Sequence, residues 1–139
     1  METIVLKFGG TSVGSISRIK KVAKLIKSYS KKYKVIVLSS AMSGTTNNLI
    51  KMSQDISSNF SFNEYDTLVS AGEQISCALL SGQLIENGLN SRSWMAWQIP
   101  IITDGEHKFS RIIHIVKKEI QRYLNSGGIP VIAGFQGIN

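Results

Sequence analysis

The sequence predicts an α/β fold, a mainly parallel open sheet with helices on both faces. Near the N-terminus, a β-prone run, an amphipathic helix and a second β-prone run follow one another, an order that favours a parallel strand–helix–strand unit. A further apolar run at residues 129–135 predicts another buried strand. The chain has 139 residues, of which 42% are hydrophobic and 18% charged, so it can bury the core of one domain.

The first strand is expected over residues 4–8, and Gly9 and Gly10 end it. Thr11 or Ser12 can then cap a helix, because both residue types are favoured at the N-cap. Apolar side chains recur at spacings of three and four along this helix and indicate its buried face. They are Ile16, Ile19, Val22, Ala23, Ile26, Tyr29 and Tyr33.

The middle of the chain predicts a strand and two helices. Residues 35–38 are all apolar, which is typical of a strand buried on both faces. A short helix is expected around residues 48–56, and a longer one over residues 64–86, with Asn87 and Gly88 at its end. The longer helix is expected to turn five side chains towards the core: Leu68, Ala71, Ile75, Leu79 and Ile85.

The last third of the chain predicts strands with one helix between them. A strand is expected over residues 93–99. Residues 112–124 give both strand and helix signals, which predict a short strand followed by a helix that ends near Gly127 and Gly128. The buried strand at residues 129–135 then leads into a loop at residues 134–139. Open α/β sheets build their sites at such loops, where strands end at the carboxyl edge.

The net charge of +7 belongs to one segment of the chain. Eight of the 16 lysines and arginines lie between Arg18 and Lys34 with no acidic residue among them, so the remainder is nearly neutral. A nucleic-acid or membrane-surface module built on this helix is an alternative, but Tyr29 and Tyr33 fall on its expected core face rather than between the lysines. No apolar stretch is long enough to span a membrane, and a cytoplasmic protein without nucleic-acid or membrane partners is expected.

Three segments are suited to binding chemistry. Lys7 and the glycines that follow it can hold an anion on a positive charge and on backbone N–H groups, although a glycine turn with a solvated lysine is the alternative. The small hydroxyl side chains of residues 39–47 suit a polar ligand or a helix-capping turn. Glu73 lies in an apolar helix, where it needs either a substrate ammonium group or a lysine as partner.

The histidines and the cysteine predict no metal site. Neither His107 nor His114 has an acidic residue or a cysteine at metal-ligand spacing. Cys77 is the one cysteine of the chain, which excludes an internal disulfide, and it is expected to be a small core residue.

Several motifs in one order resemble the N-terminal part of the aspartokinases, which belong to the amino acid kinase family. The resemblance covers nearly the whole chain. Its motifs are KFGGTSV at residues 7–13, SAMSGTTN at 40–47, LVSAGEQISCALL at 68–80, WQ at 97–98, TDG at 103–105 and AGFQGIN at 133–139.

The resemblance implies phosphoryl transfer from ATP with Mg²⁺ to the side-chain carboxylate of L-aspartate. The product, 4-phospho-L-aspartate, leads to lysine, threonine and methionine. Such a carboxylate is ionised at pH 7 and needs no general base, which fits the absence of a catalytic histidine arrangement in this sequence.

The resemblance also implies a role for each motif residue. Lys7 would be the catalytic residue at the transferred phosphoryl group. The N–H groups around Gly9, Gly10, Thr11 and Ser12 would hold that group. The substrate-binding residues would be Ser40, Thr46, Glu73, Phe135, Gln136 and Gly137, with Glu73 on the α-ammonium group.

In the family, the chain continues into an Arg-Gly-Gly-Ser-Asp segment, the nucleotide-binding half and ACT regulatory domains. Residues 1–139 are therefore expected to be a partial amino acid kinase domain, the aspartate-binding side, either as a truncated gene product or as a fragment. On their own they are expected to be inactive, with a complementary chain or a second copy as partner. The alternative is a noncatalytic remnant that binds aspartate or phosphate.

Overall fold

The predicted α/β fold with a parallel sheet is confirmed. The computed structural model describes residues 1–106 and 109–138. Its main sheet has four parallel strands in the order β1-β2-β6-β3. These strands are β1 (Thr3–Phe8), β2 (Lys34–Ser39), β6 (Ile129–Ala133) and β3 (Ser91–Trp94). The strand order places β6, the last strand in sequence, at the centre, so the loop that follows it reaches the middle of the carboxyl edge.

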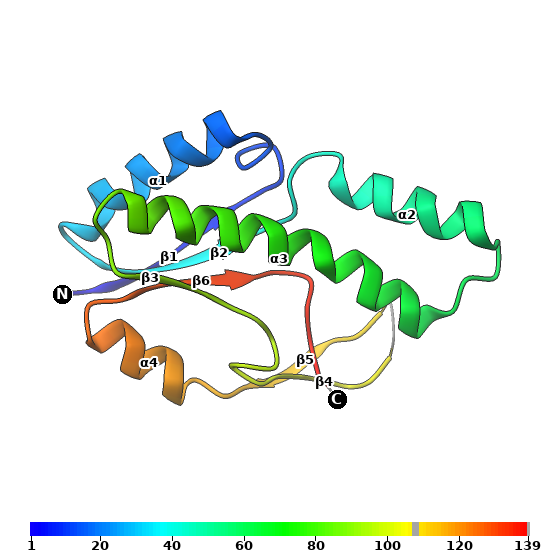
Figure 1. Cartoon of the computed structure of the whole chain (residues 1–139). Coiled ribbons are helices and arrows are strands. Elements are labelled where there is room, and N and C mark those ends of the chain that lie inside the picture. The colour runs from blue at the N-terminus through cyan, green and yellow to red at the C-terminus, as the bar shows by residue number, and fades with distance from the viewer. Residues whose placement is uncertain (107–108, 139) are drawn as a thin grey trace.

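Helices cover both faces of this sheet (Figure 1). Helices α1 (Ile16–Ser30) and α3 (Phe62–Glu86) lie on one face, and α4 (Lys118–Asn125) lies on the other. Helix α2 (Thr45–Ile56) lies beyond the carboxyl edge, beside the first half of α3. Two core clusters result, one between the sheet and the α1–α3 pair and a smaller one beneath α4.

A second, two-stranded sheet lies beside the carboxyl edge. Its antiparallel strands are β4 (Ile101–Thr103) and β5 (Ile112–Ile115), and Ile138 forms a parallel bridge with Ile102 of β4. The bridge between Ile102 and Ile138 therefore attaches the loop after β6 to this hairpin.

The prediction for the start of α1 was wrong. The N-cap is Ser15, whose side chain accepts a hydrogen bond from the Arg18 amide at 3.2 Å, rather than Thr11 or Ser12. Residues 9–14 form a separate turn before the helix, in which the Ser12 N–H donates to the carbonyl oxygen of Gly9 at 3.0 Å. Ile19, Val22, Ala23 and Ile26 are buried as expected, whereas Ile16 and Tyr29 are exposed.

The core-facing side of α3 also differs from the prediction. Ile75, Leu79 and Ile85 are exposed. The buried side consists largely of small and polar residues: Val69, Gly72, Glu73, Ser76, Cys77, Leu80, Ser81 and Leu84. Small side chains on this side let the helix lie close to α1 and to the loop after β2. The spacing of apolar residues does not predict this buried side, because few of its residues are large and apolar.

Smaller differences concern strand ends. The strand expected over residues 93–99 is β3, which starts earlier and ends at Trp94, and a turn at residues 95–100 separates it from β4. In β2, Val35 and Val37 are buried, whereas Ile36 and Leu38, on the other face of the strand, are only partly buried. The strand and helix expected within residues 112–124 are confirmed as β5 and α4, and His107 and Asn139 lie outside the described residues. Across the described chain, no helix is long and apolar enough to cross a membrane.

Candidate functional site

Three loops meet at the carboxyl edge of the main sheet. The Ser40 N–H donates to the carbonyl oxygen of Phe8 at 3.1 Å, and the Ser43 N–H donates to that of Gly10 at 3.0 Å. The Gly134 N–H donates to the carbonyl oxygen of Ser39 at 3.1 Å. Backbone hydrogen bonds thus join the loops after β1, β2 and β6, where parallel α/β sheets bind their ligands.

The glycine loop after β1 offers backbone donors to solvent. The N–H of Ser12 is used within the turn, but the N–H groups of Gly9, Gly10 and Thr11 have no acceptor among the residues that the structure describes. Lys7 is exposed and, because side chains alternate along a strand, points to the opposite face of β1 from the core-facing Phe8. The loop and this lysine are suited to an anion.

Glu73 is a buried carboxylate with an unsatisfied oxygen. The residue is 6% exposed, and its Oε2 atom has no hydrogen-bond partner among the residues that the structure describes. Burial raises the pKa of this carboxyl group, and the backbone N–H of Ala41 lowers it in part by hydrogen bonding. No lysine or arginine within residues 1–106 and 109–138 forms a salt bridge with Glu73, so the lysine partner considered from the sequence is not found among them. A small cationic group would satisfy this oxygen.

Gly72 explains how Glu73 comes so close to the loop after β2. A β carbon at Gly72 would lie 3.0 Å from the Ala41 β carbon and 3.3 Å from the Thr45 Cγ2 atom. Thr45 is thus a threonine that packs against α3, while Thr46, which the resemblance assigns to substrate binding, lies partly buried in the first turn of α2.

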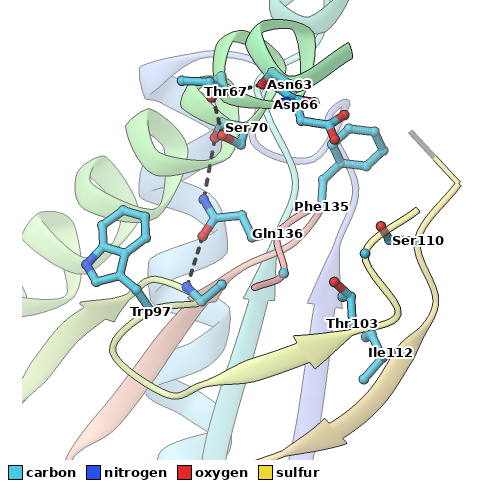
Figure 2. Close-up of a pocket in the computed structure, with 13 residues that line it drawn as sticks. Asn63, Asp66, Thr67, Ser70, Trp97, Thr103, Ser110, Ile112, Phe135 and Gln136 are labelled. Atoms are coloured by element: carbon cyan, nitrogen blue, oxygen red, sulfur yellow. Dashed lines mark hydrogen bonds between the residues drawn. The ribbon is translucent and has the colours of Figure 1, made fainter. Parts of the chain in front are cut away.

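A cavity of about 420 Å³ lies beside these loops, between α3, the β4–β5 hairpin and the loop after β6 (Figure 2). The predicted residues Phe135, Gln136 and Gly137 line it, and its volume is that of a small-molecule site. Lys7, the glycine loop, Ser40, Thr46 and Glu73 are not among its lining residues, so the predicted residues divide between the cavity and the neighbouring loop cluster.

Sequence reasoning missed the α3 side of this cavity. Four polar side chains of the helix line it: Asn63, Asp66, Thr67 and Ser70. Their spacing of three and four residues is a recognisable polar face, and it is the signal in the sequence that could have revealed them. The other lining residues are Ala96, Trp97, Thr103, Gly105, Ser110 and Ile112.

Gln136 connects three segments around the cavity. Its Oε1 atom accepts a hydrogen bond from the Ala96 N–H at 3.0 Å, and its Nε2 atom donates to the Ser70 carbonyl oxygen at 3.5 Å (Figure 2). The preceding Phe135 has a φ of 55°, which a residue with a side chain adopts only where its surroundings impose it. The side chain of Gln136 therefore fixes the loop after β6.

The amino acid kinase family matches residues 2–139. This chain belongs to that family. An aspartokinase of Rickettsia conorii is 45% identical over 143 residues, which cover 100% of this chain and 36% of the relative. The chain thus spans about a third of the length of the curated relatives that it matches.

Solved structures of amino acid kinases show the same fold. The crystal structure of aspartate kinase from Synechocystis has a TM-score of 0.82 at 38% identity, with 100% of this chain and 22% of that chain covered. Aspartokinase III of E. coli, solved in complex with aspartate and ADP, has a TM-score of 0.81 at 19% identity, with 99% of this chain and 41% of that chain covered. The predicted resemblance and fold are therefore confirmed.

Two further features bear on the chemistry open to this amino acid kinase. No group of three histidine, cysteine or acidic side chains within residues 1–106 and 109–138 could hold a metal ion. Burial, with the nearby Glu73 charge, raises the pKa of the Cys77 thiol to about 12, so the thiol stays protonated and unreactive. The exposed N–H groups of the glycine loop and the nearby Lys7 are suited to binding an anion and neutralising its charge.

Proposed function

We propose that this chain is the acceptor side of an aspartokinase, which binds L-aspartate and the phosphoryl group delivered by ATP with Mg²⁺. The observation that carries the proposal is the buried Glu73, whose Oε2 atom has no partner among the described residues. It meets the loop after β2 at Ala41, and Ala41 also packs against Gly10 of the glycine loop, which has N–H groups without an acceptor among those residues. The two features are suited to the two reacting molecules. Glu73 can bind the ammonium group of L-aspartate, and the glycine loop can bind the oxygens of the phosphoryl group.

The reaction needs no proton transfer by the protein. A carboxylate oxygen of aspartate forms a bond to the γ-phosphorus, and the bond from that phosphorus to its bridging oxygen breaks to release ADP. In this proposal Lys7 and the N–H groups of Gly9, Gly10 and Thr11 neutralise the transferred group, with Ser12 contributing its hydroxyl. The aspartate is positioned by Ser40, Thr46, Glu73 and the loop of Phe135, Gln136 and Gly137. Positioning and charge neutralisation are what phosphoryl transfer requires.

The nucleotide and its Mg²⁺ are assigned no residues of this chain. We propose that they are held by the part of the kinase domain that this chain does not match, present either in a longer chain or in a complementary one, and that the assembled kinase forms homo-oligomers in the cytoplasm. Residues 1–139 on their own are expected to bind L-aspartate without turning it over.

Binding and turnover of the purified 139-residue chain test this proposal. Isothermal titration is expected to show binding of L-aspartate but not of L-lysine, which lacks a side-chain carboxylate. Trapping of aspartyl phosphate with hydroxylamine is expected to show no turnover above background. Absence of any L-aspartate binding would contradict the acceptor-side assignment, and clear turnover would contradict the assignment of the nucleotide to another part of the protein.

A further inference from the structure

The peptide unit between Ser40 and Ala41 is held by α3 at both of its polar groups. The Ser76 hydroxyl donates to the Ser40 carbonyl oxygen at 2.5 Å. At the other side of the same peptide, the Ala41 N–H lies near enough to the Glu73 carboxyl group to lower its pKa by hydrogen bonding. Because a peptide unit is planar, fixing the direction of its carbonyl group also fixes the direction of its N–H group.

The surroundings of Ser76 restrict the acceptors that its hydroxyl group can reach. It is fully buried, and its Oγ atom lies 3.1 Å from the Glu73 carbonyl oxygen and 3.3 Å from the Ser39 Oγ atom. A hydroxyl group has one proton to donate, and the Ser40 oxygen is its nearest acceptor. The Ser39 hydroxyl can then donate to Ser76 or, at the longer distance of 3.3 Å, to the same Ser40 carbonyl oxygen.

We propose that Ser76 is a positioning residue of the candidate site, which orients the Ser40–Ala41 peptide so that the Ala41 N–H holds the Glu73 carboxylate in place. The inference rests on the proposed function in that Glu73 receives the substrate ammonium group. Ser76 does not reach the substrate in this arrangement. It acts through the loop, where the Ala41 N–H favours the charged form of the buried carboxyl group and directs it.

The test compares Ser76→Ala with Ser81→Ala. Ser81 is a matched control, since it is buried on the same helix and its hydroxyl pairs with the Ser91 Oγ atom at 3.0 Å, away from the loop. NMR titration of ligand-free protein, labelled with ¹³C in its glutamate side chains, measures the Glu73 pKa directly. Cys77, the titratable neighbour that senses Glu73, has a pKa of about 12 and does not titrate in the same range.

Ser76→Ala is expected to raise the Glu73 pKa by about one unit, because the Ala41 N–H is no longer held towards the carboxylate. It is also expected to weaken L-aspartate binding about tenfold. Ser81→Ala should change neither quantity. If Ser76→Ala does not fold, Ser76→Cys, with a side chain of similar size and a weak donor, is expected to shift the pKa in the same direction.

Equal Glu73 pKa values in Ser76→Ala and wild type would overturn the inference, whether or not aspartate binds. A raised pKa together with weakened aspartate binding supports it. A raised pKa in a protein whose wild type binds no aspartate would support the link between Ser76 and Glu73 and contradict the proposed function instead. The two failures are therefore distinguishable.

Discussion

A β carbon on Gly10 would lie 2.7 Å from the carbonyl oxygen of Ala41, whereas one on Gly9 would meet nothing within 4 Å. The loops after β1 and β2 therefore pack backbone against backbone at Gly10, and the neighbouring glycine has space around it. Since the contact is with a backbone atom, a larger residue at Gly10 has to move one of the two loops.

Gly10→Ala is expected to lower the free energy of unfolding by about 1–3 kcal/mol and to weaken phosphate binding. Gly9→Ala, next to it, is expected to have a much smaller effect on both. Urea unfolding and titration with inorganic phosphate measure the two quantities. Equal losses in the two variants would show that the close contact at Gly10 does not shape the loop.

The two glycines within α3 provide a second matched pair. A β carbon at Gly82 would meet nothing within 4 Å, so Gly82→Ala is expected to stabilise the protein by about 0.5–1 kcal/mol through helix propensity. Gly72→Ala receives the same gain but places its β carbon 3.0 Å from that of Ala41. It is expected to be less stable than Gly82→Ala by about 1–3 kcal/mol in urea unfolding. Two variants of the same stability would contradict the close approach of α3 to the loop.

The raised pKa of Glu73 predicts a pH dependence of stability. Below the usual carboxyl value of 4.5, Glu73 is protonated in both folded and unfolded chains and carries no penalty. As the pH rises through the raised pKa, the buried group must lose its proton, and the folded state loses stability. Glu73→Gln removes this titration.

Urea unfolding of wild type and Glu73→Gln, from below pH 4.5 to above the raised pKa of Glu73, measures this loss of stability. The variant is expected to gain stability relative to wild type as the pH rises, while Glu64→Gln, at an exposed position of the same helix, is expected to follow wild type. A difference between wild type and Glu73→Gln that stays constant with pH would contradict the burial of an unpaired carboxylate.

Lys7 is expected to contribute its charge to anion binding. Lys7→Met keeps an unbranched chain without the charge and should weaken phosphate binding about threefold to tenfold at low ionic strength. Lys20→Met makes the same change at an exposed position of α1 and is the control for net charge. Similar losses in both variants would indicate general attraction by a basic protein rather than a site at Lys7.

Strands β1, β2 and β6 were largely predictable because buried parallel strands leave apolar runs in the sequence. The loop cluster at the carboxyl edge was predictable for the same reason, since residues 9–14 and 39–47 each follow such a run. The motif at residues 68–80 also indicates Glu73, which is buried in the structure.

The orientation of α3 was not predictable from apolar spacing. Its buried side carries Gly72, Ser76 and Ser81 because the neighbouring loop and helix lie too close for large side chains, whereas Ile75 and Ile85 are exposed. The cavity was missed because it joins α3 to the β4–β5 hairpin, which lies far away in sequence. Close packing of small residues and contacts between distant segments leave no periodic pattern of apolar residues in the sequence.

The central claim is that Glu73 receives the ammonium group of L-aspartate, and comparison of L-aspartate with succinate tests it most directly. Succinate has the same two carboxylates but no ammonium group. Isothermal titration is expected to show that the wild-type chain prefers L-aspartate, that Glu64→Gln keeps this preference, and that Glu73→Gln loses it. A Glu73→Gln chain that still prefers L-aspartate over succinate as strongly as wild type would contradict the claim.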